Sequence, residues 1–129
     1  MLGLLAMLGL LAACGGDLPA GYVSDHQTVD GLSITLEHPT HLTLANDADL
    51  FVTLHDATGQ PIDNATVVLN PDMPAMRMGT TAPIADQLGN GRYRARMVFL
   101  MAGEWRIQVS VLLNGTQRSA TFLQTISQQ

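Results

Sequence analysis

Methionine is the residue type whose spacing first indicates chemistry in this sequence. Met73, Met76 and Met78 fall within six residues, in a segment whose two prolines disfavour a regular central strand. Their thioether sulfurs are soft ligands, which select Cu(I) among the metals that proteins bind. Methionine also fills irregular gaps in protein cores. The segment is therefore a candidate Cu(I) site, with core or surface packing as the alternative.

Four further side chains are candidates for an additional ligand. Met101 lies just before a predicted turn, His38 and His41 flank a Pro-Thr turn, and His55 ends a predicted strand. A neutral imidazole is a common metal ligand, although a solvent-exposed position is the ordinary place for each of these histidines. Ligation by histidine weakens as the pH falls through about 6.5, whereas ligation by a thioether does not.

The beginning of the sequence is typical of an exported lipoprotein. Residues 1–13 are uncharged and apolar, and they are too few to cross a bilayer as a helix. Leu11-Ala12-Ala13-Cys14 resembles the bacterial lipobox, in which a peptidase cuts before a cysteine that carries lipid. We therefore expect a signal peptide over residues 1–13 and a lipidated Cys14, with more than one acyl chain for stable anchoring. The alternatives are a plain secretory signal with an incidental cysteine and a buried N-terminal helix.

Composition argues against several classes of function. The net charge is −5 and all six basic residues are arginine, so the chain lacks the basic face that nucleic acid requires. Cys14 is the only cysteine, so no disulfide or cysteine-based metal site forms within the chain. A phosphate-binding glycine loop and a nucleophile elbow are both missing, and we expect no enzymatic activity. The predicted partners are the membrane, through Cys14, and a protein of the cell envelope.

Alternation of apolar and polar residues predicts the elements that position these side chains. We expect a flexible tether over residues 14–30, after which apolar residues recur at every second position, most clearly over Arg92–Phe99. Asn114-Gly115 is a strong hairpin signal, and we expect Ala102-Gly103 to close another hairpin. Residues 31–129 are thus predicted to form an all-β domain, an immunoglobulin-like antiparallel β-sandwich of about seven strands. The predicted core includes Tyr93, Phe99, Trp105, Ile107 and Val109.

Several motifs occur in a combination that resembles a known family. Met73-Pro74-Ala75-Met76-Arg77-Met78 is followed by Gly89 to Tyr93 and then by Met101-Ala102-Gly103-Glu104-Trp105. Together they resemble the YtkA-like domain, which is related to FixH proteins of the bacterial envelope. This resemblance implies an immunoglobulin-like sandwich outside the cytoplasm and an association with copper handling or respiratory oxidase maturation. Relatives often have a histidine just after the methionine segment, whereas Gly79-Thr80-Thr81 follows here, which favours Cu(I) over Cu(II).

The sequence thus predicts a membrane-anchored, extracytoplasmic copper-binding or copper-delivery module that uses Met73, Met76 and Met78. Its expected location is the bacterial cell envelope, on the periplasmic or extracellular face of a membrane. The alternative is an accessory lipoprotein that binds another envelope protein without metal, because exposed methionines also suit adaptable protein contacts. Convergence of the three sulfurs at the surface favours copper, and sulfurs that point into the core or apart favour the protein partner.

Overall fold

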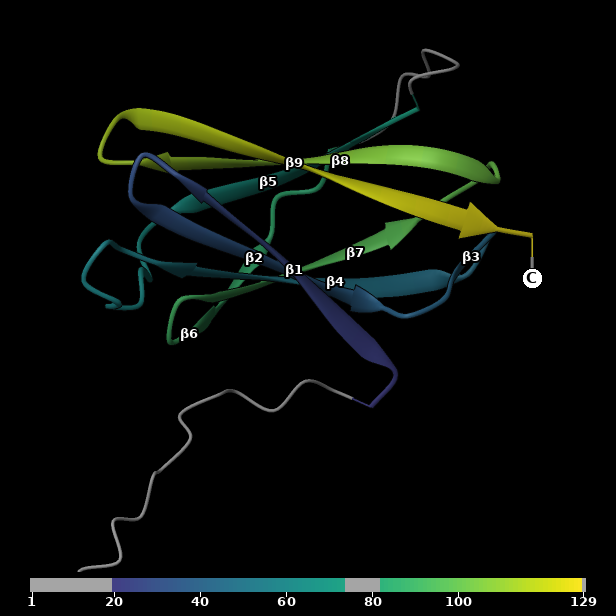
Figure 1. The fold of residues 1–129 in the computed structure, drawn as a ribbon, viewed down its shortest axis with the longest axis horizontal. Coiled ribbons are helices and arrows are strands. Elements are labelled where there is room, and N and C mark those ends of the chain that lie inside the picture. Colours follow the sequence, from purple (N-terminus) through teal and green to yellow (C-terminus); the bar gives the residue numbers. More distant parts are fainter. Residues whose placement is uncertain (1–19, 74–81, 129) are drawn as a thin grey trace, which may run out of the picture.

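The computed structural model describes residues 20–73 and 82–128, and within these ranges the chain forms strands and no helix (Figure 1). Accordingly, no helix in the described ranges is long and apolar enough to cross a membrane. The strands are β1 (Tyr22–Val29), β2 (Leu32–Pro39), β3 (Leu42–Thr43), β4 (Asp47–His55), β5 (Thr66–Asp72), β6 (Asp86–Gly89), β7 (Arg92–Val98), β8 (Gly103–Leu113) and β9 (Thr116–Ser127).

The strands form two sheets that face each other as a sandwich. One sheet has the order β1-β2-β4-β7-β6, and the other has the order β3-β9-β8-β5. In the immunoglobulin scheme, β2, β4, β7 and β6 take the places of strands A, B, E and D, while β5, β8 and β9 take those of C, F and G. The predicted all-β, immunoglobulin-like fold is confirmed. The described residues form nine strands rather than about seven, because β1 is added at one edge and the short β3 pairs parallel with β9.

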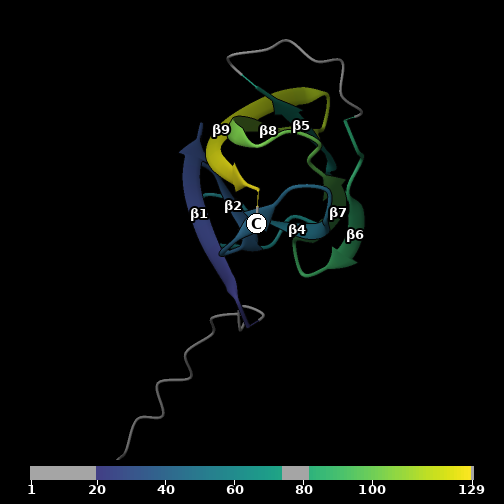
Figure 2. The ribbon, with the colours of Figure 1, turned by 90° about the vertical axis from the view of Figure 1, so that its right-hand side faces the viewer.

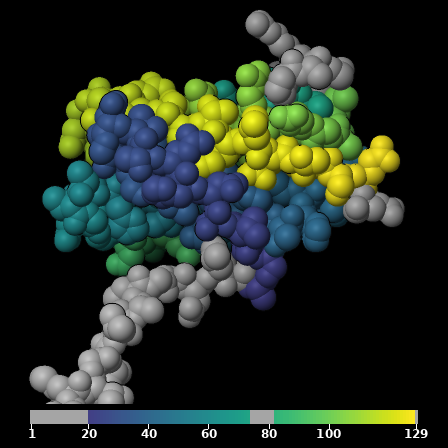
Figure 3. Space-filling model, viewed as in Figure 1, coloured from purple at the N-terminus to yellow at the C-terminus, as the bar shows by residue number. Residues whose placement is uncertain are grey.

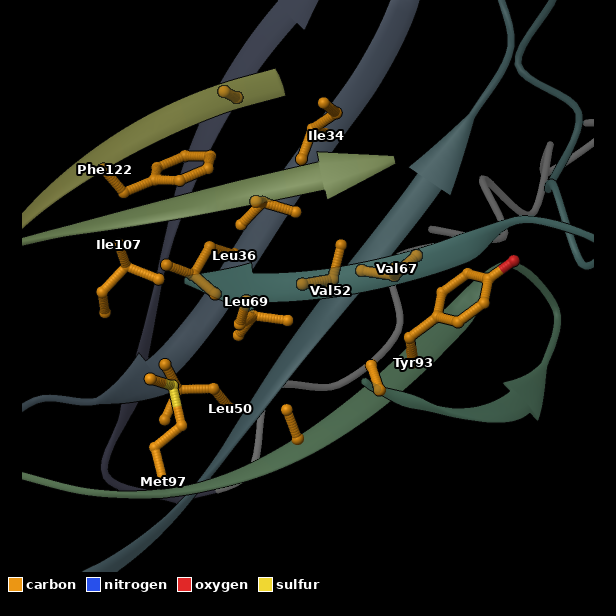
Figure 4. Packing of buried hydrophobic residues seen from close by; sticks show 14 of the residues in the cluster. Ile34, Leu36, Leu50, Val52, Val67, Leu69, Tyr93, Met97, Ile107 and Phe122 are labelled. Atoms are coloured by element: carbon orange, nitrogen blue, oxygen red, sulfur yellow. The ribbon is translucent and has the colours of Figure 1, made fainter. Parts of the chain in front are cut away.

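Period-two alternation gives each sheet one apolar face, and the two apolar faces meet in the core. Along β7 and β8 buried residues alternate with exposed ones, as the sequence predicts. Figure 4 shows side chains from both sheets, among them Leu36, Leu69 and Ile107, pointing into the space between them. The predicted core residues are all buried: Tyr93, Phe99, Trp105, Ile107 and Val109.

The prediction of a flexible tether up to residue 30 is wrong for its second half, because residues 22–29 form β1. This strand pairs antiparallel with β2 along its whole length. Its side chains are mostly exposed, and polar contacts hold it to the other sheet: Gln27 Nε2 donates to the Thr121 carbonyl, and Gln124 Nε2 donates to Asp25. β1 therefore lies along the side of the sandwich against β9 (Figures 2 and 3). An edge strand held by backbone and polar contacts has no apolar stripe that sequence periodicity can detect.

The two predicted hairpins have different outcomes. Asn114 and Gly115 have φ angles of 51° and 77° and join β8 to β9, so this hairpin is confirmed. The hairpin at Ala102-Gly103 is wrong, because β7 and β8 belong to different sheets. Residues 99–102 instead carry the chain from one sheet across to the other.

One end of the sandwich, on the right in Figure 1, gathers the segments that concern the methionines. β5 ends there, residues 99–102 join β7 to β8 there, and residues 40–46 lead there from β2 to β4. The Ala45 amide donates to the Phe99 carbonyl at 2.8 Å, which ties the two connections together. We call this the methionine end. The opposite end holds the β1–β2, β6–β7 and β8–β9 turns.

Candidate metal site

Met73 follows β5 directly and points into the core. Its exposed fraction is 7%, and it belongs to the same buried cluster as Phe99 and Trp105. Its methyl group lies against Gly103, because a Cβ built on this glycine would come within 3.0 Å of the Met73 Cε. The thioether of Met73 is therefore packed rather than displayed at the surface. For this methionine, the geometry supports the packing alternative.

Met101 lies in the β7–β8 connection, two residues before Gly103, and is half-buried against the core. Its carbonyl accepts a hydrogen bond from Trp105 Nε1 at 2.9 Å. The indole of Trp105 packs edge-on against Phe99, with the ring centroids 5.2 Å apart, so the Met101 backbone is held by a rigid part of the core. Met73 and Met101 reach the methionine end from different strands. The fold thus brings two of the candidate thioethers to one end of the molecule.

Met76, Met78 and Cys14 lie outside the described residues. Met76 and Met78 follow Met73 by three and five positions, so even a fully extended chain keeps their Cα atoms within about 11 and 18 Å of Met73. Any site that they form with Met73 therefore lies near the methionine end. Convergence of the three sulfurs stays a prediction.

His38 is buried in β2, where both of its ring nitrogens have hydrogen-bond partners. Nδ1 contacts the Pro39 carbonyl at 2.8 Å, and Nε2 contacts Asp25 Oδ2 at 3.1 Å. The same carboxylate oxygen accepts a hydrogen bond from Gln124 Nε2 at 2.8 Å. In this arrangement neither nitrogen of His38 is free to bind a metal. The cluster joins β1 to β2 and β9, a contact that sequence reasoning missed because it placed Asp25 in the tether.

The other two candidate histidines lie at opposite ends of the sandwich. His55 is the last residue of β4 and pairs with Ser33, at the end opposite the methionines. β4 has nine residues and spans about 30 Å, so His55 and Met73 are too far apart to bind one ion. His41 is exposed and lies in the connection at the methionine end. His41 is therefore the candidate histidine that is both exposed and close to the methionine end.

Harder ligands do not gather in the described part of the chain. Across residues 20–73 and 82–128, no three His, Cys, Asp or Glu side chains are placed to hold a metal ion. Charges pair instead on the outer face of the five-stranded sheet, where Arg92 contacts Glu37 at 3.1 Å and Arg96 contacts Asp49 at 3.4 Å. The arginines at alternate positions of β7, Arg92, Arg94 and Arg96, are thus partly neutralised and do not form a strongly basic surface.

Comparison with known proteins decides the family. A family model described as YtkA-like matches residues 26–110, which is well over half of the chain. The chain belongs to the YtkA-like family. The matched range runs from β1 into β8 and includes Met73, Met101 and the segment between them. The relation to FixH proteins stays a prediction. No curated protein and no solved structure matches this YtkA-like chain at a significant level.

Proposed function

We propose that this YtkA-like protein is an extracytoplasmic copper-binding or copper-delivery module, held on a membrane of the bacterial envelope by lipid on Cys14. The observation that carries the proposal is the placement of Met73 and Met101 at one end of the sandwich, where the segment with Met76 and Met78 begins. Supply of Cu(I) for respiratory oxidase maturation, or copper homeostasis, is the role proposed for such a module.

The chemistry of the donors at the methionine end fits Cu(I). Thioethers are soft ligands, and the described part of the chain offers no cluster of His, Cys, Asp or Glu that suits a harder ion. Met73 must turn its sulfur from the core toward Met101 to share an ion, and the three rotatable side-chain bonds of methionine permit this change. Met101 and the exposed His41 are the candidates for a further ligand. Three neutral thioethers leave the charge of the ion uncancelled, so we expect moderate affinity.

Competition titration tests the copper proposal. Replacing Met73, Met76 and Met78 together with leucine keeps volume and apolarity nearly constant, so the fold should survive. Each protein is titrated with Cu(I) under reducing conditions against a coloured chelator. We expect the parent to take up one equivalent and the triple variant to lose most of its affinity. Met97→Leu, which removes a buried thioether from β7, is the matched control and should bind like the parent.

The pH dependence identifies the further ligand. Methionine carries no proton to lose, so a thioether site should keep its affinity as the pH is lowered, unlike a thiolate site. A contribution from His41 should instead weaken in acid, because a protonated imidazole cannot bind a metal ion. His41→Ala and Met101→Leu, titrated at neutral and mildly acidic pH, separate the two candidates. A parent whose affinity falls in acid, with a matching loss in His41→Ala, assigns the ligand to histidine.

A second function is favoured by the exposed aliphatic side chains at the methionine end. Leu100 is 70% exposed and Val98 is 46% exposed, while Met73 is buried. These features suit an accessory lipoprotein that binds an envelope protein without metal. If the triple leucine variant binds Cu(I) as tightly as the parent, the copper proposal is refuted and this second function is favoured. Cross-linking in the native envelope should then depend on Leu100 and not on the three methionines.

A further inference from the structure

The two connections at the methionine end carry no charged side chains. Residues 40–46 and 99–102 contain no Asp, Glu, Lys or Arg, in a chain whose net charge is −5. The hydrogen bond from the Ala45 amide to the Phe99 carbonyl joins the two connections. Together they form one continuous surface whose only titratable side chain is that of His41. Covering such a surface requires little desolvation of charge.

An aliphatic side chain is displayed on this surface. Leu100, in the β7–β8 connection, is 70% exposed, and Met101 beside it is half-buried. Single exposed leucines are common on protein surfaces, so exposure alone does not identify a docking surface. The position of the surface relative to the membrane anchor supplies the second observation.

The chain that leads from the anchor enters the domain at the methionine end. The Gly21 carbonyl accepts hydrogen bonds from the Thr40 amide at 2.7 Å and from the Thr40 hydroxyl at 3.0 Å. Only seven residue steps separate Gly21 from Cys14, and they span at most about 25 Å when fully extended. β1 runs eight residues, about 27 Å, from this point toward the opposite end. A domain that rests on its methionine end therefore needs less extension of the tether than one that stands on its opposite end.

We infer that the methionine end faces the bilayer and rests on a zwitterionic phospholipid surface, with Leu100 in contact with the lipid. The inference rests on the proposed lipid anchor at Cys14. Burial of the Leu100 side chain favours this contact, and no charged side chain of the connections has to be desolvated. Asp47 and Glu104 border the surface, so anionic lipid should weaken the contact rather than strengthen it.

The test measures which part of the acylated full-length protein lies nearest the lipid. The protein is reconstituted in phosphatidylcholine vesicles that contain a phospholipid with a nitroxide on its headgroup, which quenches a nearby fluorophore. A fluorophore is placed on one introduced cysteine at a time: Asn46→Cys at the methionine end, Arg94→Cys and Gln108→Cys on the outer faces of the two sheets, and Gln117→Cys near the opposite end. We expect quenching to be strongest at position 46 and weakest at position 117.

A matched pair of leucine variants tests the contact itself. With the fluorophore at position 46, Leu100→Ser should reduce the quenching several-fold, while Leu123→Ser should leave it unchanged. Leu123 is the control because it is 61% exposed but lies on the outer face of the four-stranded sheet. Replacing half of the phosphatidylcholine with phosphatidylglycerol should lower the quenching at position 46 in the parent.

Each other outcome overturns the inference in an identifiable way. Intact-mass analysis that shows no acyl group on Cys14 refutes the anchor and this inference together. An acylated protein with equal quenching at all four positions, or with the strongest quenching at position 94 or 108, keeps the anchor and refutes only the orientation. Contact that appears in native membranes but not in lipid vesicles shows that a membrane protein, not lipid, covers Leu100.

Discussion

Replacing Trp105 with alanine should destabilise the domain by about 3–5 kcal/mol. The indole is 2% exposed and packs edge-on against Phe99, so its removal leaves a cavity between the sheets. Its Nε1 also donates to the Met101 carbonyl at 2.9 Å, a bond whose net contribution is about 0.5–1.5 kcal/mol. The total stability of a small domain is about 5–15 kcal/mol, so this single change should remove a large share of it.

Trp105→Phe separates the two contributions. Phenylalanine keeps an aromatic ring in the core but cannot donate to Met101, so this variant should lose less stability than Trp105→Ala. Urea unfolding followed by far-ultraviolet circular dichroism is the suitable assay, because Trp105 is the only tryptophan and its fluorescence disappears with it. Leu123→Ala, at an exposed position on β9, is the control and should change stability by less than about 0.5 kcal/mol. The assigned packing is refuted if Trp105→Ala costs no more than this control.

Four further outcomes follow from buried or constrained groups. Tyr93→Phe removes a buried hydroxyl that bonds to two backbone groups and should cost about 1–3 kcal/mol in urea unfolding. Gly91→Ala should cost at least about 1–3 kcal/mol in the same assay, because φ is +74° and a Cβ would lie 2.5 Å from a β4 carbonyl. Burial raises the pKa of both Tyr22 and Tyr93 above the ordinary 10.0. At alkaline pH the tyrosines therefore ionise more readily in the unfolded chain than in the folded domain, so the domain should lose stability there. The absorbance of ionised tyrosine and the unfolding signal should change together. The Thr58 hydroxyl lowers the pKa of Asp56, so ionised Asp56 stabilises the folded domain at neutral pH and this stabilisation is lost in acid. The melting temperatures of Asp56→Asn and of the parent should therefore converge as the pH falls.

The sandwich itself was predictable because its signals are local and repeated. Most strands that face the core alternate buried residues with more exposed ones, and the stripe that contains Tyr93 does so without interruption. Asn114-Gly115 adopts the two positive φ angles that a tight hairpin turn needs, and these residue types tolerate them better than most. Alternation and turn chemistry agree over most of the domain, which is why fold class and core both followed from the sequence.

The wrong predictions concern relations between distant parts of the chain. β1 is held by its backbone pairing with β2 and by contacts such as that of Gln27 with Thr121, 94 residues away in sequence. The turn residues Ala102-Gly103 show that the chain changes direction but not whether it returns to the same sheet. Gly103 has a φ angle of +132° where the chain crosses between the sheets. A glycine permits such a conformation in a hairpin turn as well as in a crossover, so its presence in the sequence does not distinguish the two.

Burial of Met73 could have been predicted from a signal that was present. Val67, Leu69, Pro71 and Met73 occupy every second position and are all buried, so Met73 continues the inward stripe of β5. Because the prolines indicated that the strand had already ended, the alternation of inward-facing residues was not continued to Met73. The placement of His55 at the opposite end likewise follows from the length of β4. By contrast, occupation of His38 Nε2 depends on Asp25 of β1 and was not accessible from sequence.

Copper binding and contact with the bilayer are both proposed for the methionine end, so the orientation of the domain determines from which side copper can reach its ligands. Met101 follows the exposed Leu100 in the β7–β8 connection, and Met73 lies at the same end of the sandwich, so a surface that rests on lipid also places the proposed copper ligands close to the membrane. A copper donor or acceptor that reaches Met101 must then approach from the bilayer side, as a membrane-embedded protein does. Copper titration needs no lipid and the orientation measurement needs no copper. A failure of either proposal therefore leaves the other open to its own test, and success of both identifies the side from which copper is exchanged.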